Sequence, residues 1–368
     1  MKIGILTLLP AENYGGILQA VALYSYLSEK GHDVTLIRKQ YAVPLWRKCV
    51  VELVRFLPLK GNKFSIIKNR YVKACKLKPF IEKYMPAQSR SIVTAAELEI
   101  LLEEERFDAV IVGSDQVWRY SYINDGHYSV YFLDVNVCYP LKKIAYAASF
   151  GLDHWEAKDK IDKVSSFLKD FTAISVREKS GAEICLKDFG VQSECVVDPT
   201  LLVGVDFYNR FFDGRMKVAS RKTLVTYILD ESENKNNFIN KVMGDLFNGD
   251  DFVQVNLAKG YEGSYYLVEE WVWEIKNAGC VITDSFHGMI FSILFEKEFF
   301  VLGNVERGLD RFLSVLIPLG LEDRIFMGEG DDFHYPASQI DYASIKELIG
   351  HQRRRSVMFI ENAISVDC

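Results

Sequence analysis

The chain has 368 residues, more than one hydrophobic core usually organises, so two domains are expected and a single small module is excluded. Apolar residues make up 49% of the chain and charged residues 26%, a globular composition that excludes wholesale disorder. Because 44 Lys and Arg oppose 50 Asp and Glu, the net charge of −6 gives no general attraction to nucleic acid. An anionic ligand would have to be bound locally.

No apolar run reaches the roughly 18 residues of a spanning helix, and the first run stops at Pro10, too early for a secretory signal. The sequence therefore predicts a cytoplasmic protein. Its seven cysteines are scattered, odd in number and without a Cys-x-x-Cys pair, so neither disulfides nor a zinc site is expected. We expect no bound metal and no resident cofactor.

In chain order, an apolar strand at 3–9, a helix ended by Gly31 and a strand at 32–37 predict a β-α-β unit with a parallel sheet. Peripheral helices are predicted at 46–57, 64–84 and 95–105. Further strands of the same sheet follow at 107–112, 143–148, 173–176 and 194–197. The stretch 60–78 is basic, which we interpret as the solvated face of a helix or, alternatively, a docking surface for a lipid-linked or partner molecule.

A second alternation of strands and helices begins at residue 223, with strands at 223–229, 252–257, 280–283 and 299–302. An irregular acidic segment at 322–336 and a helix at 341–363 close the chain. The expected fold class is α/β, with two Rossmann-like domains whose parallel sheets face a cleft. The domains are expected at 1–205 and 206–335, followed by a helical extension at 336–368.

The first strand-to-helix connection contains Asn13, Tyr14, Gly15 and Gly16. Two glycines there let backbone N–H groups approach a ligand at the positive end of a helix, so the turn is a candidate anion or sugar cradle. The alternative is a tight turn with a purely structural role. It is not the dinucleotide-binding or Walker glycine pattern.

Ser114, Asp115 and Gln116 follow directly on a strand that we expect to be buried. They lie at its carboxyl end, where open parallel sheets bind ligands. Asp115 could therefore orient a hydroxyl or act as a base. Alternatively, its carboxylate caps the turn that follows.

Arg177 lies at the end of another strand, and its planar guanidinium suits a phosphate or carboxylate. It could equally pair with Glu178 or with an acid at a domain interface.

In the second domain, Ser285, His287 and Gly288 form the strand-to-helix turn after 280–283, and Arg307 and Arg311 follow the next strand. His287 in the first helical turn could exchange a proton with a substrate or donate to a phosphate, unless it is a structural histidine. With Arg177, these residues would form a cationic pocket in an acidic protein.

Taken together, the motifs resemble those of the polysaccharide pyruvyl transferase family. The resemblance is carried, in order, by Asn13-Tyr14-Gly15-Gly16-x-x-Gln19-Ala20, Gly113-Ser114-Asp115-Gln116-Val117-Trp118, Ala145-Tyr146-Ala147-Ala148-Ser149-Phe150-Gly151, Ser175-Val176-Arg177-Glu178, Val197-Asp198-Pro199-Thr200 and Asp284-Ser285-Phe286-His287-Gly288, and by the segment 307–324.

The resemblance implies a fold similar to the GT-B glycosyltransferases and transfer of a pyruvyl group from phosphoenolpyruvate, as co-substrate, to a sugar of a surface polysaccharide or its lipid-linked precursor. The product would be a pyruvate ketal. Such an enzyme would work in the cytoplasm, with peripheral association at the inner face of the membrane as an option. The sequence gives no oligomeric state.

The implied roles fall into three groups. His287 and Asp115 would be catalytic. The donor would be bound by Arg177, Ser285, His287, Gly288, Arg307 and Arg311. The acceptor would be bound by Asn13, Tyr14, Gly15, Gly16, Ser114, Asp115 and Gln116. Two other functions stay open: a GT-B-type glycosyltransferase that uses a nucleotide sugar, and a catalytically silent homologue that acts as a binding or scaffolding subunit.

Overall fold

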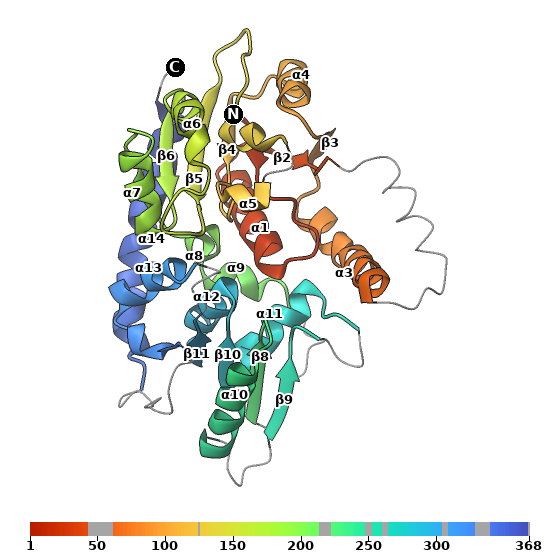
Figure 1. The fold of residues 1–368 in the computed structure, drawn as a ribbon, viewed down its shortest axis with the longest axis vertical. Helices are drawn as coiled ribbons and strands as arrows, with labels where there is room; N and C mark the ends of the chain where they lie inside the picture. Colours follow the sequence, from red (N-terminus) through yellow and green to blue (C-terminus); the bar gives the residue numbers. More distant parts are fainter. Residues whose placement is uncertain are drawn as a thin grey trace. The chain divides into compact units, whose positions relative to one another are not determined.

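The computed structural model describes residues 1–42, 62–123, 126–212, 222–246, 252–259, 264–303, 308–327 and 339–366. The chain packs into two compact units, the N-terminal unit (Met1–Pro199 with Val357–Cys368) and the C-terminal unit (Thr200–Ser356). Each unit contains its own parallel sheet with helices alongside it (Figure 1). The prediction of two Rossmann-like α/β domains is confirmed.

The sheet of the N-terminal unit has seven parallel strands in the order β3-β2-β1-β4-β5-β6-β7. Its strands are β1 (Lys2–Leu6), β2 (Asp33–Lys39), β3 (Gln88–Ile92), β4 (Ala109–Val112), β5 (Lys142–Ala148), β6 (Ala173–Val176) and β7 (Glu194–Cys195). The chain winds from β1 outward through β2 and β3, and then returns to place β4 on the other side of β1. The winding direction therefore reverses between β1 and β4.

The sheet of the C-terminal unit has five parallel strands in the order β12-β11-β10-β8-β9. They are β8 (Lys222–Tyr227), β9 (Phe252–Asn256), β10 (Cys280–Thr283), β11 (Glu298–Leu302) and β12 (Ile325–Phe326). Here β8 pairs with β9 on one side and with β10 on the other, so the reversal falls between β8 and β10.

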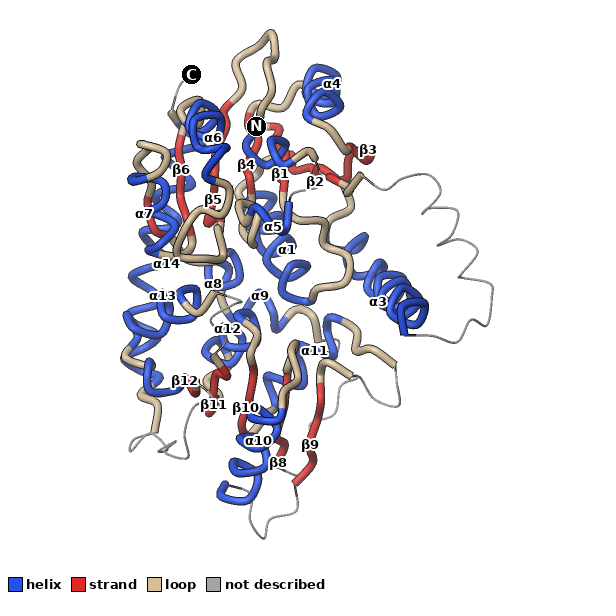
Figure 2. The backbone as a smooth tube through the Cα atoms, in the orientation of Figure 1, coloured by secondary structure: helices blue, strands red, loops and turns tan. Residues whose placement is uncertain are grey.

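Helices connect the strands and line the sheets, as parallel pairing requires (Figure 2). In the N-terminal unit they are α1 (Tyr14–Glu29), α3 (Asn62–Tyr84), α4 (Ala95–Glu105), α5 (Tyr120–Ile123), α6 (Ile161–Leu168) and α7 (Lys179–Lys187). The others are α8 (Pro199–Val203), α9 (Val205–Asn209), α10 (Glu233–Leu246), α11 (Val268–Asn277), α12 (Phe286–Leu294), α13 (Asp310–Leu319) and α14 (Tyr342–Ser365).

The central strands β4 and β10 are buried along their whole length, which is typical of parallel sheets that are covered on both faces. In the N-terminal unit, Trp118 directly after the β4 loop is fully buried, and its ring lies 5.6 Å from that of Phe132 and 5.3 Å from that of Phe150. This packing anchors the chain immediately beyond Ser114–Gln116.

The structure adds two edge strands that the sequence did not predict. β3 lies in a stretch without apolar alternation, and β12 lies in the segment 322–336 that we expected to be irregular. The helix expected at 46–57 lies outside the described residues.

The compact units divide at Pro199 and Thr200, whereas we expected the boundary after residue 205. The intervening residues belong to the C-terminal unit by their contacts: the Tyr208 hydroxyl donates to the carbonyl of Thr200 at 3.0 Å, and Arg353 Nε donates to that of Leu201 at 2.8 Å.

The segment expected as a separate extension at 336–368 is divided between the two units. Helix α14 begins in the C-terminal unit, and the residues from Val357 onward pack in the N-terminal unit. There the Phe359 ring lies 6.4 Å from that of Tyr146, and Lys142 Nζ donates to the carbonyl of Ile364 at 2.6 Å.

The end of α14 allows a matched stability test. Phe359→Ala should lower the free energy of unfolding of the N-terminal unit by about 3 kcal/mol, because this ring is buried in the core. Met358→Ala, at a neighbouring side chain that is 61% exposed, should change it by less than about 0.5 kcal/mol. Urea denaturation of the two variants measures both, and equal effects would contradict the packing.

Candidate functional site

The points where the winding direction reverses are the places where open parallel sheets bind ligands, because neighbouring loops there run apart and leave a crevice beyond the strand ends. In the N-terminal unit, the loops after β1 and β4 carry Asn13–Gly16 and Ser114–Gln116. In the C-terminal unit, the loops after β8 and β10 carry residues 228–232 and 284–288. The main motifs of the sequence thus lie at the two reversal points.

The glycine turn and Asp115 lie next to each other. Asn13 caps α1, its side-chain oxygen accepting the N–H of Gly15 at 3.0 Å, and no acidic residue occupies the first turn of the helix. A Cβ added to Gly16 would lie 3.3 Å from Oδ2 of Asp115. The glycine therefore lets the Asp115 carboxylate approach the positive end of α1.

Asp115 has a strained backbone. Its φ of 79° is in the left-handed region, as is that of Ala147 at 50°, and Asp115 forms an isolated parallel bridge with Ala148. Its Oδ1 accepts the N–H of Gln116 at 2.8 Å, which agrees with the capping alternative, while the whole residue is 8% exposed. Strained residues of this kind persist where the surroundings fix them, often at functional sites.

Gln116 lies over Gly151, where an added Cβ would come within 2.1 Å of its side-chain oxygen. Because Gly151 also has a φ of +71°, the loop after β5 needs glycine on both counts. The loops after β1, β4 and β5 thus meet at one edge of the sheet.

Arg177 is buried against carboxylates of its own unit. Its Nη1 donates to Oδ2 of Asp198 at 2.9 Å, and the hydroxyl of Ser114 donates to the same oxygen at 2.8 Å. Its Nε lies 3.7 Å from Oε2 of Glu178, so the carboxylates of Asp198 and Glu178 share the guanidinium. The pairing with Glu178 that we left open is therefore present, and the role of Arg177 in binding a donor stays a prediction.

Electrostatics connect Arg177 to the rest of the cluster. Burial acts to lower the pKa of its guanidinium, but the carboxylates of Asp198, Glu178 and Asp115 outweigh that effect and raise the pKa above its usual value. A permanent positive charge thus lies within electrostatic reach of Asp115.

The other carboxyl oxygen of Glu178 holds the loop after β5. It accepts the hydroxyl of Ser149 at 2.8 Å and the N–H groups of Phe150 at 2.8 Å and Gly151 at 3.2 Å. The buried ion cluster therefore fixes the loops that surround Asp115.

Two of the predicted acceptor residues have no exposed surface. Tyr14 and Ser114 are both 0% exposed, so they shape the site from within, whereas Asn13 at the helix cap is exposed.

Lys73 on α3 lies beside the glycine turn of the candidate site, although the sequence analysis did not predict a role for it. Its Nζ lies 4.3 Å from the centre of the Tyr14 ring. Burial lowers the pKa of Lys73 to about 8, against the opposing effect of the Glu12 carboxylate. The basic segment interpreted as a solvated face thus includes one half-buried lysine beside the glycine turn.

In the C-terminal unit, α12 begins at the motif. Ser285 caps it by accepting the N–H of Gly288 at 3.4 Å, and no acid occupies its first turn. A Cβ on Gly288 would lie 2.4 Å from Oγ1 of Thr283, so glycine is needed for the helix to start this close to β10. His287 is 6% exposed, in the first turn of this helix.

Arg311 lies near His287 because both contact Phe286. The guanidinium of Arg311 is 5.9 Å from the Phe286 ring centre, and the rings of Phe286 and His287 are 5.3 Å apart. The structure therefore places His287 and Arg311 around the Phe286 ring, with Ser285 directly before that ring in the chain. Arg307 lies outside the described residues.

Asp284 joins the two loops at the reversal point of the C-terminal unit. Its carboxylate accepts the N–H groups of Leu229 at 2.7 Å and Asp230 at 3.1 Å, and pairs with Lys235 Nζ at 2.7 Å. The sequence analysis included Asp284 and Asp198 within motifs but predicted no role for either residue. Asp284 directly follows the buried strand β10, a signal that the sequence contained, whereas Asp198 comes three residues after the exposed strand β7.

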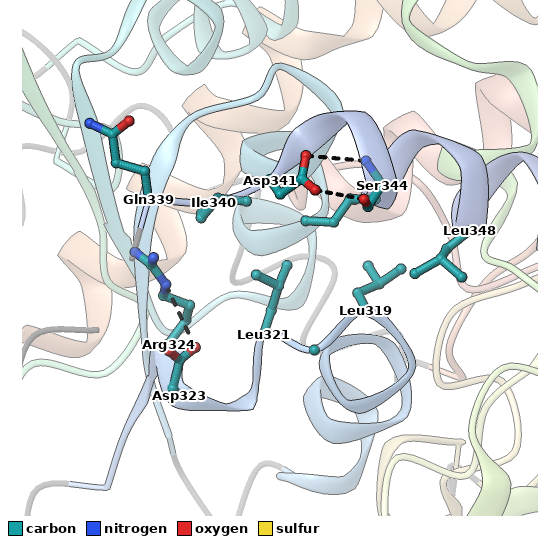
Figure 3. Close-up of a pocket in the computed structure, with 11 residues that line it drawn as sticks. Leu319, Leu321, Asp323, Arg324, Gln339, Ile340, Asp341, Ser344 and Leu348 are labelled. Carbon is teal, nitrogen blue, oxygen red and sulfur yellow. Dashed lines mark hydrogen bonds and ion pairs between the residues drawn. The ribbon is translucent and has the colours of Figure 1, made fainter. Parts of the chain in front are cut away.

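A small pocket of about 200 Å³ lies between α13 and the start of α14 (Figure 3). Its polar groups bond to one another: Asp341 Oδ2 accepts the hydroxyl of Ser344 at 2.6 Å, and Asp323 lies 3.7 Å from Arg324 Nε. It offers few groups to a ligand and is not part of the candidate site.

Within the described residues, no group of three or more His, Cys, Asp or Glu side chains is arranged to hold a metal ion. Among the same residues, no helix combines the length and apolarity needed to cross a membrane.

Two parallel sheets, each lined by helices and each with motif-bearing loops at its reversal point, define a GT-B-like fold. Solved structures with the same fold include UDP-GlcNAc 2-epimerase from Methanocaldococcus jannaschii (12% identity, 98% of this chain and 100% of that chain, TM-score 0.50). A putative UDP-N-acetylglucosamine 2-epimerase from Listeria monocytogenes is similar too (10% identity, 100% and 91% covered, TM-score 0.51). The GT-B-like fold class is thus confirmed.

The chain belongs to the polysaccharide pyruvyl transferase family, whose sequence profile matches residues 13–306. The match begins at the glycine turn and extends past the His287 turn. No curated protein sequence matches the chain. The protein is therefore a member of a transferase family, as the motifs indicated.

The start of α12 can be tested with two glycine variants. Gly288→Ala should lower the free energy of unfolding of the C-terminal unit by about 1–3 kcal/mol, because the new methyl group collides with Thr283. Gly244→Ala in α10, where an added Cβ meets nothing within 4 Å, should stabilise that unit by up to about 1 kcal/mol. Thermal unfolding separates them, and a neutral Gly288→Ala would show that α12 does not depend on the close approach.

Lys73 predicts a pH effect on stability. Because its folded pKa is about 8 and its unfolded value about 10.5, the folded state binds fewer protons between these values, and stability should rise with pH. Relative to Lys73→Gln, the wild type should gain about 1–2 kcal/mol between pH 7.5 and 10. Lys78→Gln, at a side chain that is 69% exposed, is the control. Parallel pH curves for wild type and Lys73→Gln would refute the prediction.

Proposed function

We propose that the protein transfers a pyruvyl group from phosphoenolpyruvate to a sugar of a surface polysaccharide or its lipid-linked precursor, forming a pyruvate ketal. Membership of the family supports a pyruvyl transfer. The observation that carries the proposal is the start of α12, a buried helix whose first turn contains His287 and no acidic residue and is capped by Ser285. Arg311 of α13 lies beside Phe286 in the same turn.

The reaction requires a balanced set of proton transfers. One sugar hydroxyl adds to C2 of phosphoenolpyruvate while a proton goes to C3, and the C2–O bond to phosphate then breaks. A second hydroxyl adds to C2 to close the ketal. Of the two hydroxyl protons, one ends in the new methyl group and the other leaves with phosphate. The enzyme therefore needs an acid, a base and cations for the phosphate and carboxylate.

The C-terminal unit supplies groups for the donor. The N-terminus of α12 favours an anion, and Arg311 adds a guanidinium suited to phosphate or carboxylate. His287 is the candidate acid toward C3 or the partner of the phosphate. Arg307, outside the described residues, is retained as a further donor contact.

The N-terminal unit supplies groups for the acceptor. Asp115 is the candidate base or positioning group for the sugar hydroxyl, held by its strained backbone and by the glycine turn. Arg177, through Asp198 and Glu178, orders the loops around Asp115. We therefore add a positioning role to the anion-binding role that the sequence suggested for Arg177.

The test is an assay of the purified protein with phosphoenolpyruvate and a panel of lipid-linked and aryl sugars, with and without EDTA. Phosphate release and a product mass gain of one pyruvyl group are measured together. A parallel panel of nucleotide sugars tests the glycosyltransferase alternative. Sugar transfer from a nucleotide sugar, without phosphate release from phosphoenolpyruvate, would overturn the proposal.

In this assay, His287→Ala should lower the rate of phosphate release by about 10²–10⁴-fold, the range typical of a lost general acid. The exposed His351 on α14 gives the control His351→Ala, which should keep full activity. Circular dichroism and thermal unfolding show whether the fold is intact. Full activity of a folded His287→Ala protein would refute the assignment.

A further inference from the structure

A second pocket lies beside the glycine turn in the N-terminal unit. It has a volume of about 370 Å³ and is bounded by the loop 9–11, by strands β2 and β3 and by one face of α3. This volume falls in the range of small-molecule sites. The loop that forms one wall continues directly into Asn13–Gly16, so the pocket adjoins the predicted acceptor side.

The lining of this pocket is mixed. Its apolar residues are Leu9, Pro10, Ala11, Leu36, Ala74 and Ile81. Its polar residues are Arg38, Tyr71, Cys75, Lys78, Glu82 and Gln88. An apolar surface interrupted by several hydrogen-bonding groups suits a ligand that is itself both apolar and polar over a short distance.

Arg38 gives the pocket a positive charge. It is half-buried on β2, and among the described residues its guanidinium has no carboxylate partner; its backbone N–H donates to the hydroxyl of Ser89 at 3.1 Å. By contrast, Lys78 is paired with Glu82 at 3.3 Å. A guanidinium so placed matches a carboxylate in bidentate geometry.

The remaining polar groups suit hydroxyls. Gln88 donates its amide N–H to the carbonyl of Met85 at 3.0 Å, which leaves its side-chain oxygen as an acceptor. Glu82 is a second acceptor. Tyr71, a residue that is 39% exposed, contributes an aromatic ring to the lining. Aromatic and aliphatic walls with a few polar groups fit the C–H faces and hydroxyls of a sugar ring.

We propose that this pocket is a subsite for a carboxylate-bearing sugar, of the uronic acid type, in the acceptor next to the sugar that is pyruvylated. The carboxylate pairs with Arg38, and the ring lies against Tyr71 and the aliphatic wall. This inference rests on the proposed function for its place in catalysis, and it names the acceptor class that the enzyme selects.

Binding is tested first, independently of catalysis. Methyl glucuronide and methyl glucoside differ in the carboxylate, and their dissociation constants are measured by NMR titration. The glucuronide should bind wild type at least about tenfold more tightly, because a charge-assisted pair is lost with the glucoside. Arg38→Gln should remove this difference, Arg38→Lys should restore part of it, and the control Arg90→Gln, at an exposed arginine paired with Glu104, should keep it.

Cys75 reports occupancy of the same pocket. Its thiol is exposed and borders the pocket, so glucuronide should slow its alkylation, read by peptide mass analysis, in wild type but not in Arg38→Gln. The exposed Cys138, which does not line the pocket, is the internal control. Octyl phosphate is included as an apolar anion.

The outcomes separate the two proposals. Equal binding of glucuronide and glucoside, an unchanged preference in folded Arg38→Gln, or protection of Cys75 by octyl phosphate alone would overturn the subsite. If glucuronide binds as expected but no sugar is pyruvylated, the proposed function fails while the sugar subsite stands. If both hold, Arg38→Gln should lower the ratio of pyruvyl transfer to a uronate-containing disaccharide over transfer to its neutral counterpart.

Discussion

The reversal of winding direction in each parallel sheet is the constraint on which the rest of the structure depends. A parallel strand must be followed by a crossover, and crossovers in one direction stack strand after strand with no opening between their loops. Only where the chain turns back, between β1 and β4 and again between β8 and β10, do adjacent loops run apart. The unusual residues of this chain, paired glycines, a strained aspartate and a histidine at a helix start, gather at these openings.

The loops around such an opening have to be held in place, and in both units buried charged side chains hold them. Asp198 accepts a hydrogen bond from Ser114 in the loop after β4, and Glu178 accepts one from Phe150 in the loop after β5. Both acids are paired with Arg177, while Asp284 joins the loop after β8 to the start of α12. A buried charge costs free energy unless it is paired and fully hydrogen-bonded, so each of these groups fixes its partners in one arrangement. The buried acids in the loops after the strands are therefore as informative about loop geometry as the exposed residues of the site.

The sequence was sufficient for the fold class because it depends on long-range alternation. The runs Ala109–Val112 and Cys280–Ile282 are apolar throughout, as is typical of parallel sheets that are covered on both faces. The strands β3 and β12 were missed because edge strands are short and are covered less, so their sequences need no such pattern. The glycine turn, Asp115 and His287 could be predicted because the end of a strand is recognised from the few residues around it.

Contacts between segments that are distant in the chain could not be predicted from the sequence. The guanidinium of Arg177 is chemically suited to bind an anion, but its environment depends on Asp198. Asp198 approaches Arg177 only when β6 and β7 pair. Lys73 looked like one lysine among many on a basic helix, and only the docking of α3 near Tyr14 distinguishes it. Arg38 lies one residue beyond the strand that the sequence predicted at 32–37, and only the packing of α3 against β2 and β3 makes it part of a pocket wall. Such residues are identified by what surrounds them rather than by their neighbours in the chain.

The division of α14 also bears on how the protein is made. The N-terminal unit takes most of its strands from the first half of the chain, yet part of its core comes from residues after Val357. On the ribosome, these residues emerge after the whole C-terminal unit. The first unit to be synthesised is thus the last to receive all of its core, and until then the surface that Phe359 covers stays open to solvent or to a chaperone.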